Sequence, residues 1–134
     1  MGQPAAKMGD KVVGLDIHIV MVPAPPAPPV PTPLPHPFNG IIDGGCSANV
    51  KIEGKAAATV GSTATNTPSH IPSGGPSFQV PPTNKGNITM GSTTVMINGK
   101  PAARMGDTAL TCNDPAPLPN GKIVLAGPCK VMIG

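Results

Sequence analysis

The sequence is poor in the residues that build most protein cores and most charged binding surfaces. It has 134 residues with no tryptophan, no tyrosine and only two phenylalanines, and 11% of its residues are charged. The formal net charge is +3, and the lysines and arginines form no cluster. Because a nucleic-acid-binding surface needs clustered cations or stacking aromatics, this composition argues against a nucleic-acid partner.

Long apolar runs are also missing. The longest such stretch, residues 15–22, is interrupted by Asp16 and His18 and is too short to span a bilayer. No apolar run of signal-peptide length follows the N-terminus, so we expect synthesis in the cytosol without a signal peptide. The three cysteines are an odd number and contain no Cys-x-x-Cys motif, which argues against a disulfide framework.

Proline and glycine are abundant instead. The 20 prolines and 17 glycines are spread along the chain, which argues against long helices and is also typical of disordered chains. No hydrolase or nucleotide-binding motif is present, and the single glutamate, Glu53, is expected in a turn. We therefore expect no enzyme activity, with a metal-dependent hydrolase as the alternative. The length allows a single domain, residues 1–134.

An internal repeat organises the chain. Residues 46–62 and 91–107 align and share valine, isoleucine, glycine, lysine and an Ala-Ala pair at matching positions. Residues 127–134 match the first half of this unit, and residues 2–10 match its second half. The third repeat is thus split between the chain ends, as expected of a closed ring with pseudo-threefold symmetry. We therefore predict that the two termini lie side by side and that the last strand pairs with the first.

Each unit has the pattern of a β-hairpin. Valine and isoleucine alternate at period two before the turn, and Asn98-Gly99 is a strong turn signal. The returning strand carries the Ala-Ala pair, whose small side chains would let three units approach closely around an axis. The predicted fold class is all-β, with three pseudo-threefold β-hairpin repeats and long loops that converge at one end.

The repeat units resemble the PAAR-repeat family. The resemblance rests on Pro-Ala-Ala-Arg-Met-Gly-Asp at residues 101–107, on its near copy at residues 4–10, and on the lead-in Gly-Ser-x-x-Val-x-Ile-x-Gly-Lys at residues 91–100. It implies a small conical fold that caps the trimeric VgrG-type spike of a contractile injection machine, such as a type VI secretion system. The middle unit departs from the pattern, with Ala-Ala-Ala-Thr at residues 56–59 and Gly-Ser at residues 61–62.

The resemblance also implies a role. The protein would be a non-enzymatic tip that sharpens the spike and aids membrane puncture and effector delivery. One copy would bind the spike trimer through its blunt face, with effector proteins as further partners. It would be made in the bacterial cytoplasm and exported on the spike to the extracellular space or a target cell. An adaptor that recruits effectors is the alternative function. Four basic residues are expected to make surface hydrogen bonds or spike contacts: Lys7, Lys55, Lys100 and Arg104.

Three histidines and one cysteine are the candidate metal ligands. His18 and His70 each lie nine residues after the glycine of their repeat, and Cys112 lies six residues after the third such glycine. Each hairpin would thus send one ligand-bearing loop toward the axis, and His36 would supply the fourth ligand. This set suits one structural Zn²⁺ per chain, and the resemblance implies a zinc site of the same composition. The ligand types also suit Fe²⁺ or Ni²⁺.

The alternative is that these side chains pack or lie exposed without binding a metal. Cys46 and Cys129 compete for the sulfur position, but both fall within the hairpin framework and are expected to pack as small apolar residues. Asp10 and Asp107, each after a glycine, are expected to cap turns rather than to bind a metal.

Three long loops are predicted between the hairpins. Residues 23–37 contain nine prolines and are predicted to form a stiff Pro-rich loop that runs along the surface and delivers His36. Residues 62–89 are predicted to form a second loop with His70, and residues 111–121 a third with Cys112.

Overall fold

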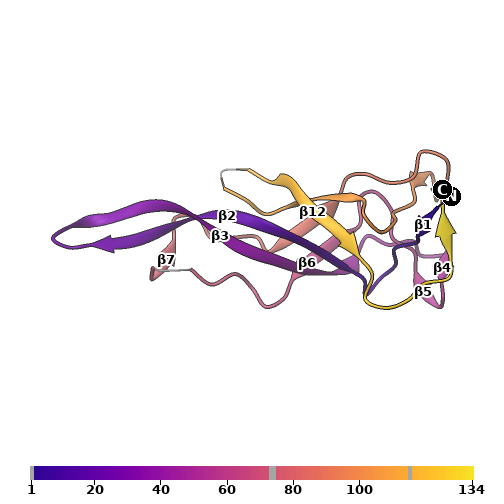
Figure 1. Ribbon diagram of the computed structural model, residues 1–134, viewed down its shortest axis with the longest axis horizontal. Helices are drawn as coiled ribbons and strands as arrows, with labels where there is room; N and C mark the ends of the chain where they lie inside the picture. The colour runs from indigo at the N-terminus through magenta and orange to yellow at the C-terminus, as the bar shows by residue number, and fades with distance from the viewer. Residues whose placement is uncertain (1, 73–74, 115) are drawn as a thin grey trace.

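The computed structural model describes residues 2–72, 75–114 and 116–134. Within these ranges the chain forms thirteen strands and no helix, so the predicted all-β class is confirmed. Accordingly, the described residues contain no helix long and apolar enough to cross a membrane. Figure 1 shows an elongated molecule with both chain ends at its blunt end and one long hairpin projecting at the other.

A closed antiparallel sheet forms the middle of the molecule. Around it, β2 (Lys11–Ala24) pairs with β3 (Ala27–Gly44), then β3 with β6 (Thr63–Asn66), β6 with β8 (Lys85–Ile88), β8 with β11 (Thr108–Thr111), β11 with β12 (Leu118–Val124), and β12 with β2. The short strand β7 (Ser77–Phe78) pairs with β2 farther along the hairpin. The interior is filled by alternate side chains of these strands, which include Val12, Phe38, Ile42, Ile88 and Ile123.

Three small hairpins form the blunt end. They are β4 (Lys51–Ile52) with β5 (Lys55–Ala56), β9 (Met96–Ile97) with β10 (Lys100–Pro101), and β1 (Gln3–Pro4) with β13 (Met132–Ile133). The third joins the two ends of the chain, with Gln3 opposite Ile133, which confirms that the last strand pairs with the first. One buried isoleucine from each hairpin packs in a second apolar cluster.

A ring of three alanines marks the pseudo-threefold axis. The N–H of Ala6 donates to the carbonyl of Ala103 (3.0 Å), that of Ala103 to Ala58 (3.0 Å), and that of Ala58 to Ala6 (3.1 Å). All three residues are fully buried. A larger side chain at any of them would meet the other two repeats, because interiors are close-packed. The small alanine pair of each repeat is therefore what lets the three units close around the axis.

The Pro-rich segment is not the predicted loop. Residues 27–37 belong to β3, and β2 and β3 form the projecting hairpin. Asn39 turns its N–H to the Asn66 side chain and its carbonyl to the Thr67 N–H, away from β2. The N–H and carbonyl groups of successive residues in a strand point alternately to its two edges. The odd-numbered residues of β3 between residue 30 and Asn39 therefore also turn these groups away from β2. These residues are Pro31, Pro33, Pro35 and Pro37.

The prolines therefore lie where they break no ladder bond. Beyond the end of β6, no strand of the described residues pairs with this side of β3. Proline is tolerated on such a free edge because its missing N–H would have faced solvent, and it also denies other strands a donor. From residue 30 to residue 40, the even-numbered residues of β3 keep their N–H groups for pairing with β2, which explains how a Pro-rich run can form a strand.

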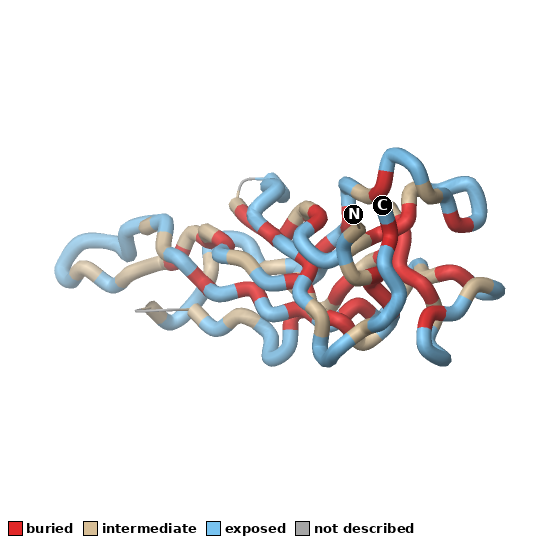
Figure 2. Tube along the Cα trace, turned by 45° about the vertical axis from the view of Figure 1, so that its right-hand side comes forward, coloured by how far each residue is buried: buried red, intermediate tan, exposed pale blue. Residues whose placement is uncertain are grey.

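The other two predicted loops are also partly strands. Residues 62–89 include β6, β7 and β8, and residues 111–121 begin in β11 and end in β12. Residues 73, 74 and 115 of these segments lie outside the described residues. Figure 2 shows that buried residues run through the barrel and the blunt end, whereas the outer end of the projecting hairpin is exposed.

Candidate metal centre

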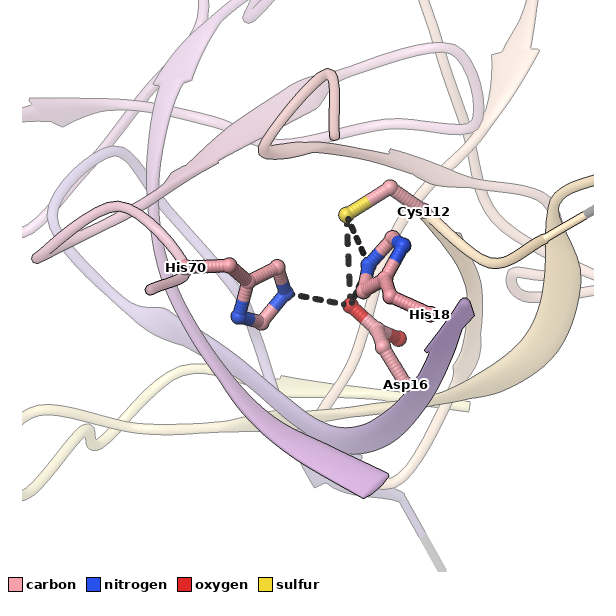
Figure 3. A group of neighbouring side chains, drawn as sticks. All are labelled: Asp16, His18, His70 and Cys112. Carbon is pink, nitrogen blue, oxygen red and sulfur yellow. Dashed lines mark hydrogen bonds and ion pairs between the residues drawn. The ribbon is translucent and has the colours of Figure 1, made fainter. Parts of the chain in front are cut away.

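Four polar side chains converge inside the hairpin half of the barrel. Asp16 and His18 come from β2, where a spacing of two residues places both on its inner face. Cys112 directly follows β11, and His70 lies in the segment between β6 and β8. Figure 3 shows the four side chains pointing toward one another from these three parts of the chain.

The distances suit a single metal ion. One ligand atom from each of the four residues lies within 4.8 Å of all the others. Asp16 Oδ2 is 2.9 Å from His70 Nε2 and 3.2 Å from Cys112 Sγ, and that sulfur is 3.6 Å from His18 Nε2. Ligand atoms of a tetrahedral zinc lie about 3.3–3.8 Å apart, given bonds of about 2.0–2.3 Å. Small side-chain shifts would therefore bring these atoms around one ion.

The Asp16 carboxylate is held firmly from behind. Its Oδ1 accepts hydrogen bonds from the Thr111 hydroxyl and from Asn113 Nδ2, the latter at 3.2 Å. Asn113 also accepts the N–H of Ile17 at 2.7 Å, which ties the segment after β11 to β2. The carboxylate is fully buried, and its Oδ2 faces His18, His70 and Cys112.

Burial favours the uncharged forms of Cys112 and His18 when no metal is bound. Burial, with the nearby Asp16 carboxylate, raises the pKa of the Cys112 thiol to about 12. Burial also lowers the pKa of His18, with His70 acting in the same direction and the carboxylates of Asp114 and Asp16 opposing it. A thiol and a neutral imidazole are thus the metal-free forms, and a metal must displace the thiol proton to bind sulfur.

His18 carries a further sign of an incomplete site. Its Nδ1 is buried and has no hydrogen-bond partner among the described residues, although Asp114 Oδ2 lies 3.6 Å away. Metal-binding histidines usually donate their other ring nitrogen to a carboxylate or a carbonyl. A slight approach of Asp114 would give His18 this arrangement, with Nε2 free to face an ion.

His36 lies at the margin of the group. Its ring centroid is 5.6 Å from those of both His18 and His70, and its Nδ1 is 2.9 Å from the Leu34 carbonyl. Phe78 of β7 packs against both His18 and His36 and covers this side. The structure thus brings His18, His70 and Cys112 together with Asp16, and His36 beside them.

Asp16 was not anticipated from the sequence, where the repeat phase identified only histidines and a cysteine. The available signal was its place in an apolar segment, two residues before His18, because a strand turns such residues to the same face. The other two cysteines lie elsewhere. Cys46 packs against the barrel core and Cys129 against the blunt-end cluster, which confirms their predicted packing role.

The predicted turn caps are confirmed. Asp10 Oδ2 accepts the N–H of Lys7 at 3.0 Å, and Asp107 Oδ2 accepts the N–H of Arg104 at 2.8 Å. Ser62 Oγ makes the equivalent bond in the middle repeat, at 3.0 Å. Lys7 differs from the expectation of a surface residue, since it is 6% exposed and its ammonium pairs with Asp10 at 3.2 Å.

Comparison with known proteins supports the same framework. The family model described as PAAR motif matches residues 35–115 and, in a second match, residues 79–134. The search of curated proteins found no match, and neither did the search of solved structures. The two family matches together span well over half of the chain, and they contain the hairpins β4–β5 and β9–β10 and the C-terminal strand β13. The chain therefore belongs to the PAAR-motif family.

Proposed function

We propose that this chain is the non-enzymatic, zinc-stabilised tip of the spike of a contractile injection machine. It caps a trimeric VgrG-type protein with one copy, in a type VI secretion system or a related particle. It is made in the bacterial cytoplasm and leaves the cell on the spike, where it aids membrane puncture and the delivery of attached effectors.

The pseudo-threefold blunt end carries this proposal. A single chain can match a threefold partner only if it offers three similar surfaces related by rotation about the same axis. The hairpins β4–β5, β9–β10 and β1–β13 supply such surfaces around the alanine ring. Methionine side chains extend this end outward, with Met96 57% and Met132 56% exposed. Exposed apolar side chains of this kind suit a protein interface.

Zinc would join the parts of the hairpin half. The nitrogen and sulfur donors of His18, His70 and Cys112 fit zinc, and His36 is the fourth ligand that the family resemblance implies. When bound, zinc would supply a structural cross-link between β2, the segment after β6 and the segment after β11. Such a link can contribute on the order of 10 kcal/mol to a small domain. This protein has few aromatic residues to provide a core instead.

Binding to the spike tests the docking face. A purified trimeric VgrG-type spike protein would be mixed with the wild type, with Met96→Glu/Met132→Glu, and with Val30→Glu as the matched control. Val30 is 49% exposed near the opposite end of the molecule. Native mass spectrometry should show one wild-type chain per trimer, a weakened complex for the double variant, and an unchanged complex for the control. Wild-type binding that depends on Val30 and not on the methionines would contradict the proposed docking face.

A further inference from the structure

We propose that the outer part of the β2–β3 hairpin, residues 22–33, inserts by itself into the interfacial layer of neutral lipid membranes. This inference rests on the puncturing role proposed above and deepens it, because it gives the leading end an affinity of its own for lipid. A purely mechanical point enters a membrane only under the force of the machine, whereas this hairpin partitions there unaided. Its charge, its backbone donors and its position all favour lipid as the partner.

The chain segments that build the projecting end carry almost no exposed charge. Residues 17–42, 56–84 and 115–121 contain no lysine, arginine, aspartate or glutamate. These stretches include the whole outer hairpin and β7, which pairs with it. Asp16 and Asp114 flank two of the stretches, but their side chains are only 0% and 12% exposed. Because moving an exposed charge out of water is costly, a surface without charge is suited to lipid.

Apolar side chains cover this end of the molecule instead. Val30 is 49% exposed, and Ile71 and Val80, in the segment between β6 and β8, are 74% and 54% exposed. Apart from Val30 and Ala27, every exposed residue from 22 to 33 is a proline. Figure 2 shows this exposed outer end of the hairpin. Burial of such side chains at the boundary between headgroups and acyl chains supplies favourable free energy.

The free edges of the outer hairpin carry prolines where a strand would otherwise present N–H donors. On β3, Pro31 and Pro33 face away from β2. On β2, the N–H groups of Ile17 and Ile19 point away from β3, and Pro23 continues this alternation. An unpaired N–H finds no acceptor in hydrocarbon, so the prolines remove a cost that keeps ordinary edge strands out of lipid. The edge carbonyls still need water or headgroup donors, which limits insertion to the interfacial layer.

The position of the hairpin lets it reach lipid first. Figure 1 shows it projecting from the end opposite both chain ends, and therefore opposite the proposed docking face. Beyond Val20 and Met21, which pair with β7, no third strand of the described residues joins the hairpin. From Met21 to the turn at residues 25–26, the hairpin advances by four residues, or about 13 Å. This exceeds the ~5–10 Å by which interfacial segments enter the boundary between headgroups and acyl chains.

A tryptophan reporter can locate the hairpin relative to lipid, because the chain has no tryptophan of its own. Ala27→Trp places the reporter beside the turn, and Met90→Trp is the matched control. Met90 is 58% exposed, and its N–H donates to the carbonyl of Thr108 in the barrel. The whole chain would be mixed with neutral phosphatidylcholine vesicles whose brominated acyl chains quench nearby tryptophan. We expect quenching of Ala27→Trp and not of Met90→Trp, unchanged by salt because the hairpin has no charge.

A charge placed on the hairpin should reverse this behaviour. Adding Val30→Asp to Ala27→Trp should weaken partitioning into the vesicles by at least about 10-fold, because the carboxylate must stay hydrated. Adding Val124→Asp to Ala27→Trp is the matched control, since Val124 is 41% exposed in β12. This control should leave the partitioning unchanged. Circular dichroism would verify that every variant folds.

Several results would overturn the inference. They are an unquenched Ala27→Trp, equal quenching of the two reporters, and partitioning that Val30→Asp leaves intact. Binding that requires anionic lipid and disappears with salt would instead assign the lipid contact to the exposed lysines of the blunt end, which are Lys51, Lys55, Lys100 and Lys130. Spike binding is measured without lipid, so a chain that binds the trimer but does not enter vesicles would refute the lipid affinity alone.

Discussion

Replacing the turn cap of each repeat by alanine should destabilise the protein by amounts that follow the order Asp10, Asp107, Ser62. The three residues are equivalent in the repeat and accept the same backbone N–H, three residues earlier in the chain. They differ in charge and in what else they hold. The comparison therefore separates the shared backbone bond from the ion pairs that only two of the repeats possess.

The magnitudes follow from burial. Loss of Asp10 leaves the Lys7 ammonium without its carboxylate in a site where Lys7 is 6% exposed, and it also removes the acceptor of the Ala126 N–H. An uncompensated buried charge costs about 3–5 kcal/mol. The Arg104 side chain is 24% exposed, so in Asp107→Ala water replaces much of its pairing with the carboxylate. The free energy of unfolding should then fall by about 2–3 kcal/mol, for loss of the hydrogen bonds to the charged carboxylate. Ser62 makes only neutral hydrogen bonds, for a loss of about 1–2 kcal/mol.

Urea unfolding of the metal-loaded protein would measure these differences. Circular dichroism is the suitable signal because the chain has no tryptophan and no tyrosine. An unchanged slope with denaturant would show that only stability had changed. Equal losses in all three variants, or the largest loss in Ser62→Ala, would refute the assignment of the charged pairs as the source of the difference.

Three further predictions concern other parts of the molecule. The metal-free protein should lose stability as pH falls below 6.5, because the pKa of His18 is lowered in the folded chain and the unfolded chain therefore binds the proton first. It should also lose stability as pH rises above 9.0 toward about 12, because the raised pKa of the folded Cys112 thiol makes the unfolded chain ionise first. Melting temperatures that stay flat across both ranges would contradict this. Pro33→Thr/Pro35→Thr should create edge N–H donors and cause concentration-dependent self-association in light scattering, whereas Thr32→Val, whose N–H faces β2, should not. Ala58→Leu should lower the free energy of unfolding by about 3 kcal/mol or prevent folding, because it overpacks the alanine ring, and a small effect would mean that the ring has room.

Most of the blunt end could be predicted from the sequence because its signals are local. Period-two alternation, Asn98-Gly99 and the alanine pairs are properties of short segments, and the split repeat implied that the chain ends meet. The pairing of Gln3 with Ile133 confirms that inference. Symmetry made it possible to infer a long-range contact from a local pattern.

The hairpin half was harder to predict because tertiary context decides it. Proline is usually a reason to reject a strand, and only the register shows that Pro31 and Pro33 face a free edge. No equivalent position in the other repeats pointed to Asp16 as a site residue, and its convergence with His70 and Cys112 depends on how the barrel closes. Burial of Lys7 likewise depends on the neighbouring Asp10, which the repeat pattern alone does not place in space.

Metal content of the purified protein tests the central claim most directly. Elemental analysis would compare the wild type with Cys112→Ser and, as the matched control, with Cys129→Ser, whose sulfur packs at the blunt end. The account predicts one zinc per chain in the wild type and in the control, and none in Cys112→Ser, together with a lower melting temperature for that variant. A folded wild type without metal, or zinc retained after removal of the Cys112 thiol, would contradict it.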